Sequence, residues 1–385
     1  LLPRDVHVTG LGMPYLLTTT PFNFKIMVSC DKSKQDQYFF SRFNLNGNGN
    51  YDLEGLRIGG SRNSIFSNIK ITSCPDAGIK LFPTHPDSGD IENFELNHIW
   101  TVLSGGIKLM TNSTIARGNI TDGEIYDCQL TTGDENKNTG LPVYWECSPD
   151  RYIFGVRMQR IFTMCTENNH IAIKPNGGQI YSNTFSDFSG ESWKIGTVGA
   201  NYGINHPCLY IFEGGFFDNS FDKFYRVGVQ GMGLYLGPGC KNNTFNELSF
   251  KATDEFNVNN RFIYLDTDTS FNTFSNISFP DNFYMNMYGK GSASIANKIF
   301  GIGGKIQDYG FDNHFSNSCI KNIVPVILKR DYLFNVSGTQ LTNYPMPSCK
   351  FTKIDSGIEI EAPAGSNALY LDIAFKVPSN FKGNK

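Results

Sequence analysis

Short stretches of alternating apolar and polar residues recur along most of the chain. In one type of stretch, apolar residues flank a single variable position. This spacing predicts a short β-strand that buries one face and leaves the central side chain on the other. The copies of this element are Gly55–Ile58, Gly78–Leu81, Gly106–Leu109, His170–Ile173, Cys208–Ile211, Gly233–Leu236 and Phe262–Leu265.

A second repeated element has the pattern Asn-x-Phe-x-x-apolar and accompanies most copies of the first. No copy is long enough to bury its own apolar face, so successive units must stack into a continuous core. The sequence therefore predicts a solenoid. The copies are Asn63–Ile71, Glu92–Trp100, Asn183–Phe188, Asn219–Phe224, Asn243–Leu248, Asn272–Ile277 and, less completely, Asn313–Ser318.

The repeat indicates a particular kind of solenoid and a boundary near its end. The spaced leucines of leucine-rich repeats are missing, and the period is too short and irregular for a propeller, so we expect a parallel β-helix. Asn suits its turns because it tolerates left-handed backbone and its amide bonds nearby backbone groups. We expect the helix to span residues 1–320. For residues 321–385 we expect a small sandwich-like β element that either caps the β-helix or forms trimer contacts. We expect this element to be cut short at its end.

Composition excludes several other classes of protein. The chain has 385 residues, of which 39 are Gly and 39 are Asn, 18% are charged and 14% aromatic, with a net charge of −3. Weak helix formers argue against a helical protein, and abundant aromatic residues argue against disorder. The small net charge argues against nucleic-acid binding, and no apolar run is long enough to span a membrane. We expect the nine Cys to be buried and reduced, and no metal or other cofactor, because the six His are scattered.

These repeats resemble the pectate-lyase-like right-handed parallel β-helix superfamily and, within it, the tailspike depolymerases of bacteriophages. The likeness rests on the repeated coils and on Asn44–Gly49 before Gly55–Gly60, which is similar to the entry into the first coils of such spikes. It implies a homotrimer on a virion tail that binds a bacterial capsule or O-antigen polysaccharide and cleaves it by hydrolysis or β-elimination. A secreted bacterial enzyme of the same fold and a non-catalytic adhesin are the alternatives. The calcium and basic signatures of pectate lyases are not visible.

If the strands of the first repeated element, Gly55–Ile58 and its later copies, stack in register, their central residues form one outward row. The basic end could hold an acidic polysaccharide, and the tyrosines offer flat faces for sugar rings. The alternative is that the tyrosines support the sheet or are covered by a neighbouring subunit. The row comprises Arg57, Lys80, Lys108, Ala172, Tyr210, Tyr235 and Tyr264.

Two irregular stretches, residues 131–152 and 189–207, interrupt the repeat. Long insertions in solenoids usually build the binding face, so we expect substrate contacts from Trp145 with Glu146 and from Trp193 with His206. The alternative for each Trp is an anchor that packs a loop on the coil.

Hydrolysis of a glycoside requires two carboxylates, and the central third of the chain supplies several. We favour Glu191 and Glu213 as catalytic residues, with Asp187 next, because they lie in or near the second insertion and its aromatic residues. The alternative for each of these three carboxylates is a solvated turn residue with no catalytic role. The remaining carboxylates are Glu146, Glu167, Asp218 and Asp222, and a lyase would instead use Lys80, Lys108, Lys194, His170 or His206.

Overall fold

The structure is a computed structural model of the whole chain, and in the part that it describes every regular element is a β-strand. The chain divides into two compact units, Leu1–Val324 and Pro325–Lys385, which are considered separately. Among the described residues, no helix has the length and apolar character to cross a membrane. The described residues are 6–9, 15–17, 26–31, 37–47, 53–84, 89–132, 141–165, 170–192, 207–229, 232–252, 261–279, 284–287, 296–308, 313–316, 350–354 and 357–361.

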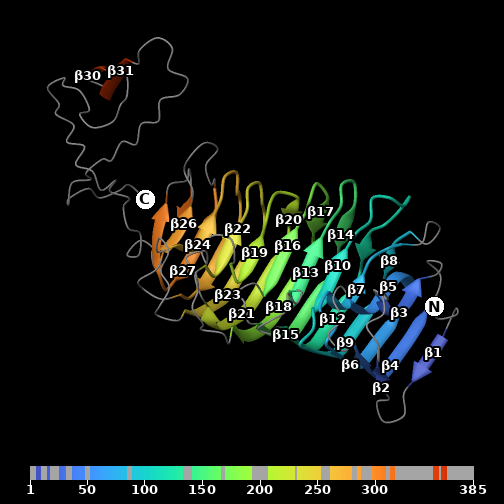
Figure 1. Cartoon of the computed structure of the whole chain (residues 1–385). Coiled ribbons are helices and arrows are strands. Elements are labelled where there is room, and N and C mark those ends of the chain that lie inside the picture. Colours follow the sequence, from blue (N-terminus) through green and yellow to red (C-terminus); the bar gives the residue numbers. More distant parts are fainter. Residues whose placement is uncertain are drawn as a thin grey trace. The chain divides into compact units, whose positions relative to one another are not determined.

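One long parallel sheet, sheet A, forms one side of the first unit. Its strands follow one another along the solenoid in chain order (Figure 1). They are β1 (Val6–Thr9), β2 (Tyr15–Leu17), β4 (Tyr38–Asn46), β6 (Ile65–Thr72), β9 (Glu95–Val102), β12 (Glu124–Thr131), β15 (Arg157–Cys165), β18 (Thr184–Ser192), β21 (Ser220–Val229), β23 (Thr244–Ala252), β25 (Thr273–Ile277), β27 (Lys298–Ile302) and β29 (His314–Phe315).

Two further parallel sheets, B and C, complete the coils and are joined through β5 (Glu54–Arg62). Residues 54–58 of β5 pair with β7 of sheet B, and residues 61–62 pair with β8 of sheet C. The other strands of sheet B are β3 (Ile26–Asp31), β7 (Ala77–Leu81), β10 (Ile107–Met110), β13 (Val143–Glu146), β16 (Ile171–Lys174), β19 (Leu209–Ile211), β22 (Leu234–Leu236), β24 (Arg261–Leu265), β26 (Tyr284–Met287) and β28 (Lys305–Asp308). Those of sheet C are β8 (Ile91–Glu92), β11 (Ile120–Thr121), β14 (Tyr152–Phe154), β17 (Gln179–Tyr181) and β20 (Phe216–Phe217).

The chain visits the sheets in the order A, B, C and repeats, so that β6, β7 and β8 make one coil and β9, β10 and β11 make the next. Every strand pair of the first unit is parallel, and each strand pairs with its counterparts in the coils on either side. This arrangement confirms the predicted all-β fold and the parallel β-helix. The two repeated sequence elements are the strands of sheet A and sheet B.

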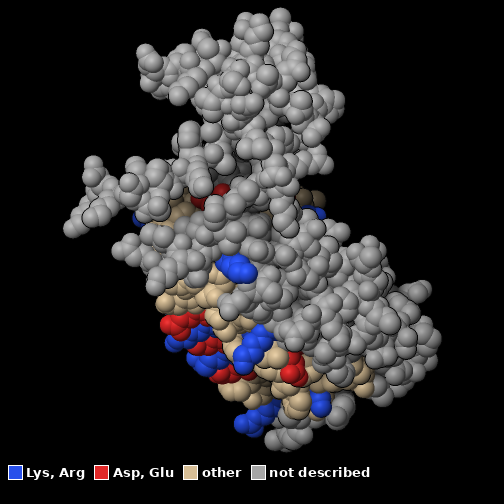
Figure 2. All heavy atoms as spheres, turned by 90° about the vertical axis from the view of Figure 1, so that its left-hand side faces the viewer, with Lys and Arg blue, Asp and Glu red and all other residues tan. Residues whose placement is uncertain are grey.

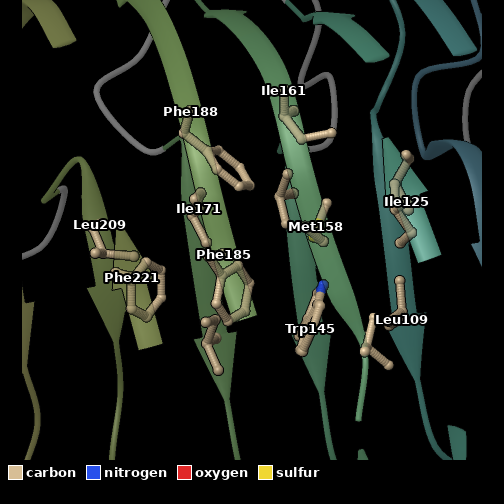
Figure 3. Close-up of a cluster of buried hydrophobic side chains, with 14 of the residues drawn as sticks. Leu109, Ile125, Trp145, Met158, Ile161, Ile171, Phe185, Phe188, Leu209 and Phe221 are labelled. Carbon is tan, nitrogen blue, oxygen red and sulfur yellow. The ribbon is translucent and has the colours of Figure 1, made fainter. Parts of the chain in front are cut away.

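Like residues stack along the interior because neighbouring strands are in register. Phe185, Phe221, Phe245 and Phe274 occupy one row of sheet A, and their adjacent ring centroids lie 4.3, 5.3 and 4.9 Å apart with nearly parallel planes. Figure 3 shows side chains of sheets A and B directed toward one another in this core. The repeated Phe of the sequence motif is therefore the core residue of each coil.

The repeated Asn forms a second row at the turn before sheet A, buried except at Asn313, which is half-buried. The backbone N–H of each Asn donates to the side-chain oxygen of the Asn in the next coil, at 2.9 to 3.0 Å, and the side-chain amide donates to the same oxygen. The row satisfies polar groups that would otherwise be buried without partners. We call it the Asn ladder: Asn183, Asn219, Asn243, Asn272, Asn297 and Asn313.

The first two sequence copies align differently from the prediction. Phe66 and Phe185 belong to the same row, but Asn63 lies three residues before Phe66 whereas Asn183 lies two residues before Phe185. Asn63 and Asn93 are exposed residues with φ of 53° and 50°, one position before the row of the Asn ladder. These two residues therefore adopt the left-handed conformation of the turn and are not members of the Asn ladder.

The second unit has one described element, an antiparallel pair of β30 (Lys350–Ile354) and β31 (Gly357–Glu361). Both strands lie within residues 321–385, for which the sequence predicts a β element. The other strands predicted for residues 321–385 lie outside the described residues, and the sandwich-like element stays a prediction.

Candidate functional site

The outward row predicted on the sheet B strands is present. Arg57, Lys80 and Lys108 are register partners in sequence, and so are Ala172, Tyr210, Tyr235 and Tyr264. Tyr144, which the sequence prediction missed, lies between Lys108 and Ala172 in the same row. The predicted irregular insertion at 131–152 is therefore wrong for residues 143–146, which form β13 and place Tyr144 in the row.

The basic half of this row is paired with buried or half-buried carboxylates. Arg57 donates to both oxygens of Glu54 at 2.6 Å, Lys80 donates to Glu54 at 2.9 Å, and Lys108 donates to Asp76 at 2.7 Å. Burial alone would raise the pKa of Asp76, but Lys108 and Lys80 together hold it below its usual range. Three cations thus face two carboxylates, so this half offers little free positive charge to an acidic polysaccharide.

The tyrosine half forms a compact aromatic cluster. The Tyr210 and Tyr235 rings meet edge to face at 5.1 Å, and the Tyr235 and Tyr264 rings stack at 5.7 Å. Tyr235 and Tyr264 are only 8% and 7% exposed, and Met232 packs beside them, whereas Tyr210 is half-buried. The more accessible rings are therefore those of Tyr210 and Phe212, whose centroids lie 3.8 Å apart.

Asp266, which sequence reasoning did not single out, lies at the edge of the tyrosine cluster. It follows β24, and its carboxylate accepts hydrogen bonds from the Tyr235 hydroxyl and, at 2.7 Å, from the backbone N–H of Thr267. The pKa of Tyr235 is raised by burial and then by Asp266, and that of Tyr210 by burial and then by the charge of Asp266. The carboxylate therefore acts electrostatically on two tyrosines of the row.

Glu213 lies two coils from Asp266 along sheet B. It follows β19 and is half-buried, and its backbone carbonyl accepts a hydrogen bond of 3.2 Å from the Cys240 thiol. The pKa of Cys240 is raised by burial and then by the charges of Glu213 and Asp266. Glu213 and Asp266 thus belong to the coils on either side of the one that contains this thiol.

Glu146 also has a hydroxyl partner in sheet B. It accepts hydrogen bonds from the Tyr144 hydroxyl at 2.7 Å and from the Asn176 side chain at 3.1 Å, and it pairs in register with Lys174. The pKa of Tyr144 is raised by burial and then by Glu146. Glu146 is half-buried, so it remains accessible to a ligand near the middle of the row.

Trp145 does not lie on the surface, which corrects the predicted substrate contact. It is fully buried, pairs in register with Leu109 and Ile173, and its ring lies 4.8 Å from that of Phe185 (Figure 3). Strand alternation explains this position, because Tyr144 and Glu146 take the outward face of β13. Trp145 is a core residue. Trp193 and His206, the other predicted contacts of this type, lie outside the described residues.

The other predicted catalytic carboxylates lie on sheet A, away from Glu213. Asp187 is an exposed residue with φ of 53°, at a corner where each long strand bends, and it lies 3.9 Å from the Lys223 ammonium. Its counterparts in the two preceding coils, Asp127 and Arg160, form a paired salt bridge. This setting is that of a corner residue in alternating ion pairs. Glu191 is exposed near the end of β18.

The residues considered for β-elimination are less accessible than the sequence indicated. His170 is fully buried, its Nδ1 lies 2.7 Å from the Thr163 hydroxyl, and burial lowers its pKa well below the usual value. Lys80 and Lys108 are occupied by the carboxylates described above, and Lys194 lies outside the described residues. In the described part of the chain, no group of His, Cys, Asp and Glu side chains is arranged to hold a metal ion.

Charges of both signs lie next to one another on the surface drawn in Figure 2. Arg157 with Glu124 and Arg62 with Glu92 are two such ion pairs, each between neighbouring coils. Such a surface offers no extended field of one sign for an oppositely charged polymer.

Comparisons with known proteins add little to this geometry. No protein-family model matches the chain, and no curated protein sequence does. The solved structures include the crystal structure of PfbA, a surface adhesin of Streptococcus pneumoniae, which is similar with a TM-score of 0.36 and 11% sequence identity over 91% of this chain and 85% of that one. A likeness at this level supports no argument about function.

Proposed function

We propose that this protein binds a polysaccharide on the outer face of sheet B and hydrolyses it between Glu213 and Asp266. The observation that supports the proposal most is that Glu213 and Asp266 follow strands two coils apart in sheet B, with Asp266 hydrogen-bonded to the Tyr235 hydroxyl and Glu213 next to Phe212 in the chain. Aromatic rings next to paired carboxylates suit a sugar, because the rings pack against its apolar C–H faces while the carboxylates reach its oxygens.

The separation favours hydrolysis with inversion. Adjacent coils lie about 4.8 Å apart, so the backbones at Glu213 and Asp266 are about 10 Å apart. Inverting glycosidases hold their two carboxyl groups roughly 6.5–9.5 Å apart, which leaves room for the attacking water. In the proposed complex the two side chains lean toward each other across the sugar, which brings their carboxyl groups within that range.

The two carboxylates take different roles in the proposed reaction. Asp266, which already accepts two hydrogen bonds, acts as the base that removes a proton from water while the oxygen of that water attacks the anomeric carbon. Glu213 donates its proton to the glycosidic oxygen as the bond between that oxygen and the anomeric carbon breaks. One water molecule is consumed, and each of the two sugar fragments ends with a hydroxyl group.

The biological setting that we propose is that of a phage tailspike. A homotrimer on the virion tail would apply the sheet B face to a capsule or O-antigen polysaccharide of the host bacterium. Support comes from the parallel β-helix and from the sequence resemblance, and a secreted enzyme remains the alternative. Light scattering tests the assembly, because a monomer in solution would count strongly against the tailspike.

The reaction is tested by adding the protein to purified capsular and O-antigen polysaccharides and measuring new reducing ends. We expect Glu213→Gln and Asp266→Asn each to lower turnover at least roughly 100-fold, within the range attributed to acid–base groups. Asp268→Asn is the matched control, because Asp268 is an exposed residue of the same turn with φ of 57°, where Asn is well tolerated.

Other outcomes separate the remaining functions. Ultraviolet absorbance from an unsaturated uronate would mean β-elimination and would reject hydrolysis. Binding without any shortening of the polymer would indicate an adhesin. If Glu191→Gln abolishes turnover while Glu213→Gln does not, the catalytic carboxylates lie on sheet A and our assignment is wrong.

A further inference from the structure

A second row of aromatic residues lies on the outer face of sheet A, beyond the corner marked by Asp187. Trp100, Gln129, Phe162, Ser189 and Tyr225 are successive register partners in five neighbouring coils. We call these five residues the exposed row. An aromatic ring thus occurs in every second coil, and a side chain that can form hydrogen bonds occurs in each coil between.

The exposed row is more accessible than the tyrosine cluster of sheet B. Trp100 is 45% and Tyr225 40% exposed, and Phe162 is half-buried. Leu103 and Val227, also exposed, lie near its two ends in the same strands or just after them. Exposed apolar surface that gathers in one place on a protein usually marks a binding site.

A lysine accompanies the ring at each end of the exposed row. The Lys70 ammonium lies 4.7 Å from the centre of the Trp100 ring, and that of Lys251 lies 5.5 Å from the centre of the Tyr225 ring. Cation–π contacts of this kind orient the rings. The ammonium groups also supply hydrogen-bond donors for hydroxyl or carboxylate groups of a ligand.

The spacing of the exposed row favours a polymer with a regular repeat. Two coils separate neighbouring rings, a distance of about 10 Å. This is close to the length of a disaccharide unit in an extended polysaccharide, so alternate sugars would meet rings while those between would meet Gln129 and Ser189. A protein partner is less well matched, because Gln129 and Ser189 separate the rings, so the row has no continuous apolar core of the kind that protein interfaces have.

We propose that the exposed row is a second, non-catalytic polysaccharide-binding site, along which a polymer lies parallel to the solenoid axis. It is separate from Glu213 and Asp266, which follow strands of sheet B. The inference rests on the proposed polysaccharide ligand but does not depend on cleavage. Its role is to retain long chains near the protein, so it adds affinity for polymers and none for short oligosaccharides.

The test compares a Trp100→Ala/Tyr225→Ala double variant with wild type by affinity electrophoresis in gels that contain purified capsular or O-antigen polysaccharides, with dextran as a reference. We expect the double variant to bind the retained polymer at least about tenfold more weakly, a loss typical of truncated aromatic anchors. Turnover of short oligosaccharides should stay at the wild-type rate. Phe271→Ala is the matched control, because Phe271 is 59% exposed but lies in a turn outside the row.

Equal retention of the double variant and wild type would overturn the proposal, as would a wild-type protein that no polymer in the panel retains. Sedimentation supplies a further check. If wild type is an oligomer and the double variant a monomer, the exposed row is a contact between copies and the proposal is wrong. An Asp266→Asn variant with full turnover would reject the hydrolytic site but would leave this binding test unaffected.

Discussion

Replacing one member of the Asn ladder should destabilise the coils on both sides of it. Asn243 is 1% exposed. Its side-chain amide donates to the Phe216 carbonyl at 3.2 Å and to the Asn272 side chain at 3.0 Å. Its side-chain oxygen accepts from the backbone N–H and the side-chain amide of Asn219 at 3.0 and 3.2 Å. Alanine at this position would remove all four hydrogen bonds.

The expected cost follows from which groups keep a partner. The Asn219 side-chain amide retains the carbonyls of Ile180 and Phe217, both at 2.9 Å. The Phe216 carbonyl retains the Lys241 N–H at 3.2 Å. The buried backbone N–H of Asn219 loses its acceptor, which alone costs about 1–3 kcal/mol. With the net loss of the three remaining bonds at about 1 kcal/mol each, Asn243→Ala should lower the free energy of unfolding by about 4–6 kcal/mol.

Urea unfolding followed by circular dichroism measures this change, and hydrogen exchange locates it. Amide protection should fall first in the coils that contain Asn219 and Asn272. Asn242→Gly is the control, since Asn242 is exposed with φ of 55°, a conformation that glycine adopts readily, and its change should stay within about 1 kcal/mol. If Asn243→Ala is no more destabilising than this control, the Asn ladder does not hold the coils together.

Three further predictions concern the core, the ion pairs and the thiols. Phe221→Ala should destabilise by about 3–5 kcal/mol in the same urea assay, because the residue is buried between two stacked rings. Asp76 has a lower pKa in the folded than in the unfolded chain, so its pairing with Lys108 stabilises at neutral pH and is lost as the pH falls below the ordinary value of 3.8. Asp76→Asn should therefore destabilise at pH 7 and flatten the acid limb of the stability curve, and an unchanged acid limb would contradict this. Burial raises the pKa of Cys128 to about 12 and raises that of Cys240, so peptide mapping after iodoacetamide treatment should find both unmodified until denaturant is added.

The sequence predicted the fold well because the solenoid repeats local information. Each coil must place apolar residues inward at matching positions, so the copies of Asn-x-Phe and Gly-Ile-Lys-Leu indicate both the strands and their faces. The outward row from Arg57 to Tyr264 followed from alternation alone. Alternation within residues 143–146 would also have placed Trp145 inside and Tyr144 outside, but the stretch was interpreted as an insertion.

The candidate site was less predictable because its partners come from turns. Glu54 begins β5 and Asp76 comes just before β7, at positions that no repeat specifies, so the pairing of the lysines could not be foreseen. Asp266 follows β24 in a turn, and only the stacking of coils brings it to Tyr235. Sequence patterns determine which face a strand residue occupies, but not how a turn directs its side chain.

The most direct test of the proposed function is the crystal structure of the Asp266→Asn variant with a bound oligosaccharide from a polysaccharide that wild type cleaves. We predict sugar rings against Tyr210 and Phe212 on the outer face of sheet B, with a glycosidic bond between residues 213 and 266. An oligosaccharide bound instead beside Glu191 on sheet A, with its glycosidic bond remote from Glu213, would contradict the proposed site.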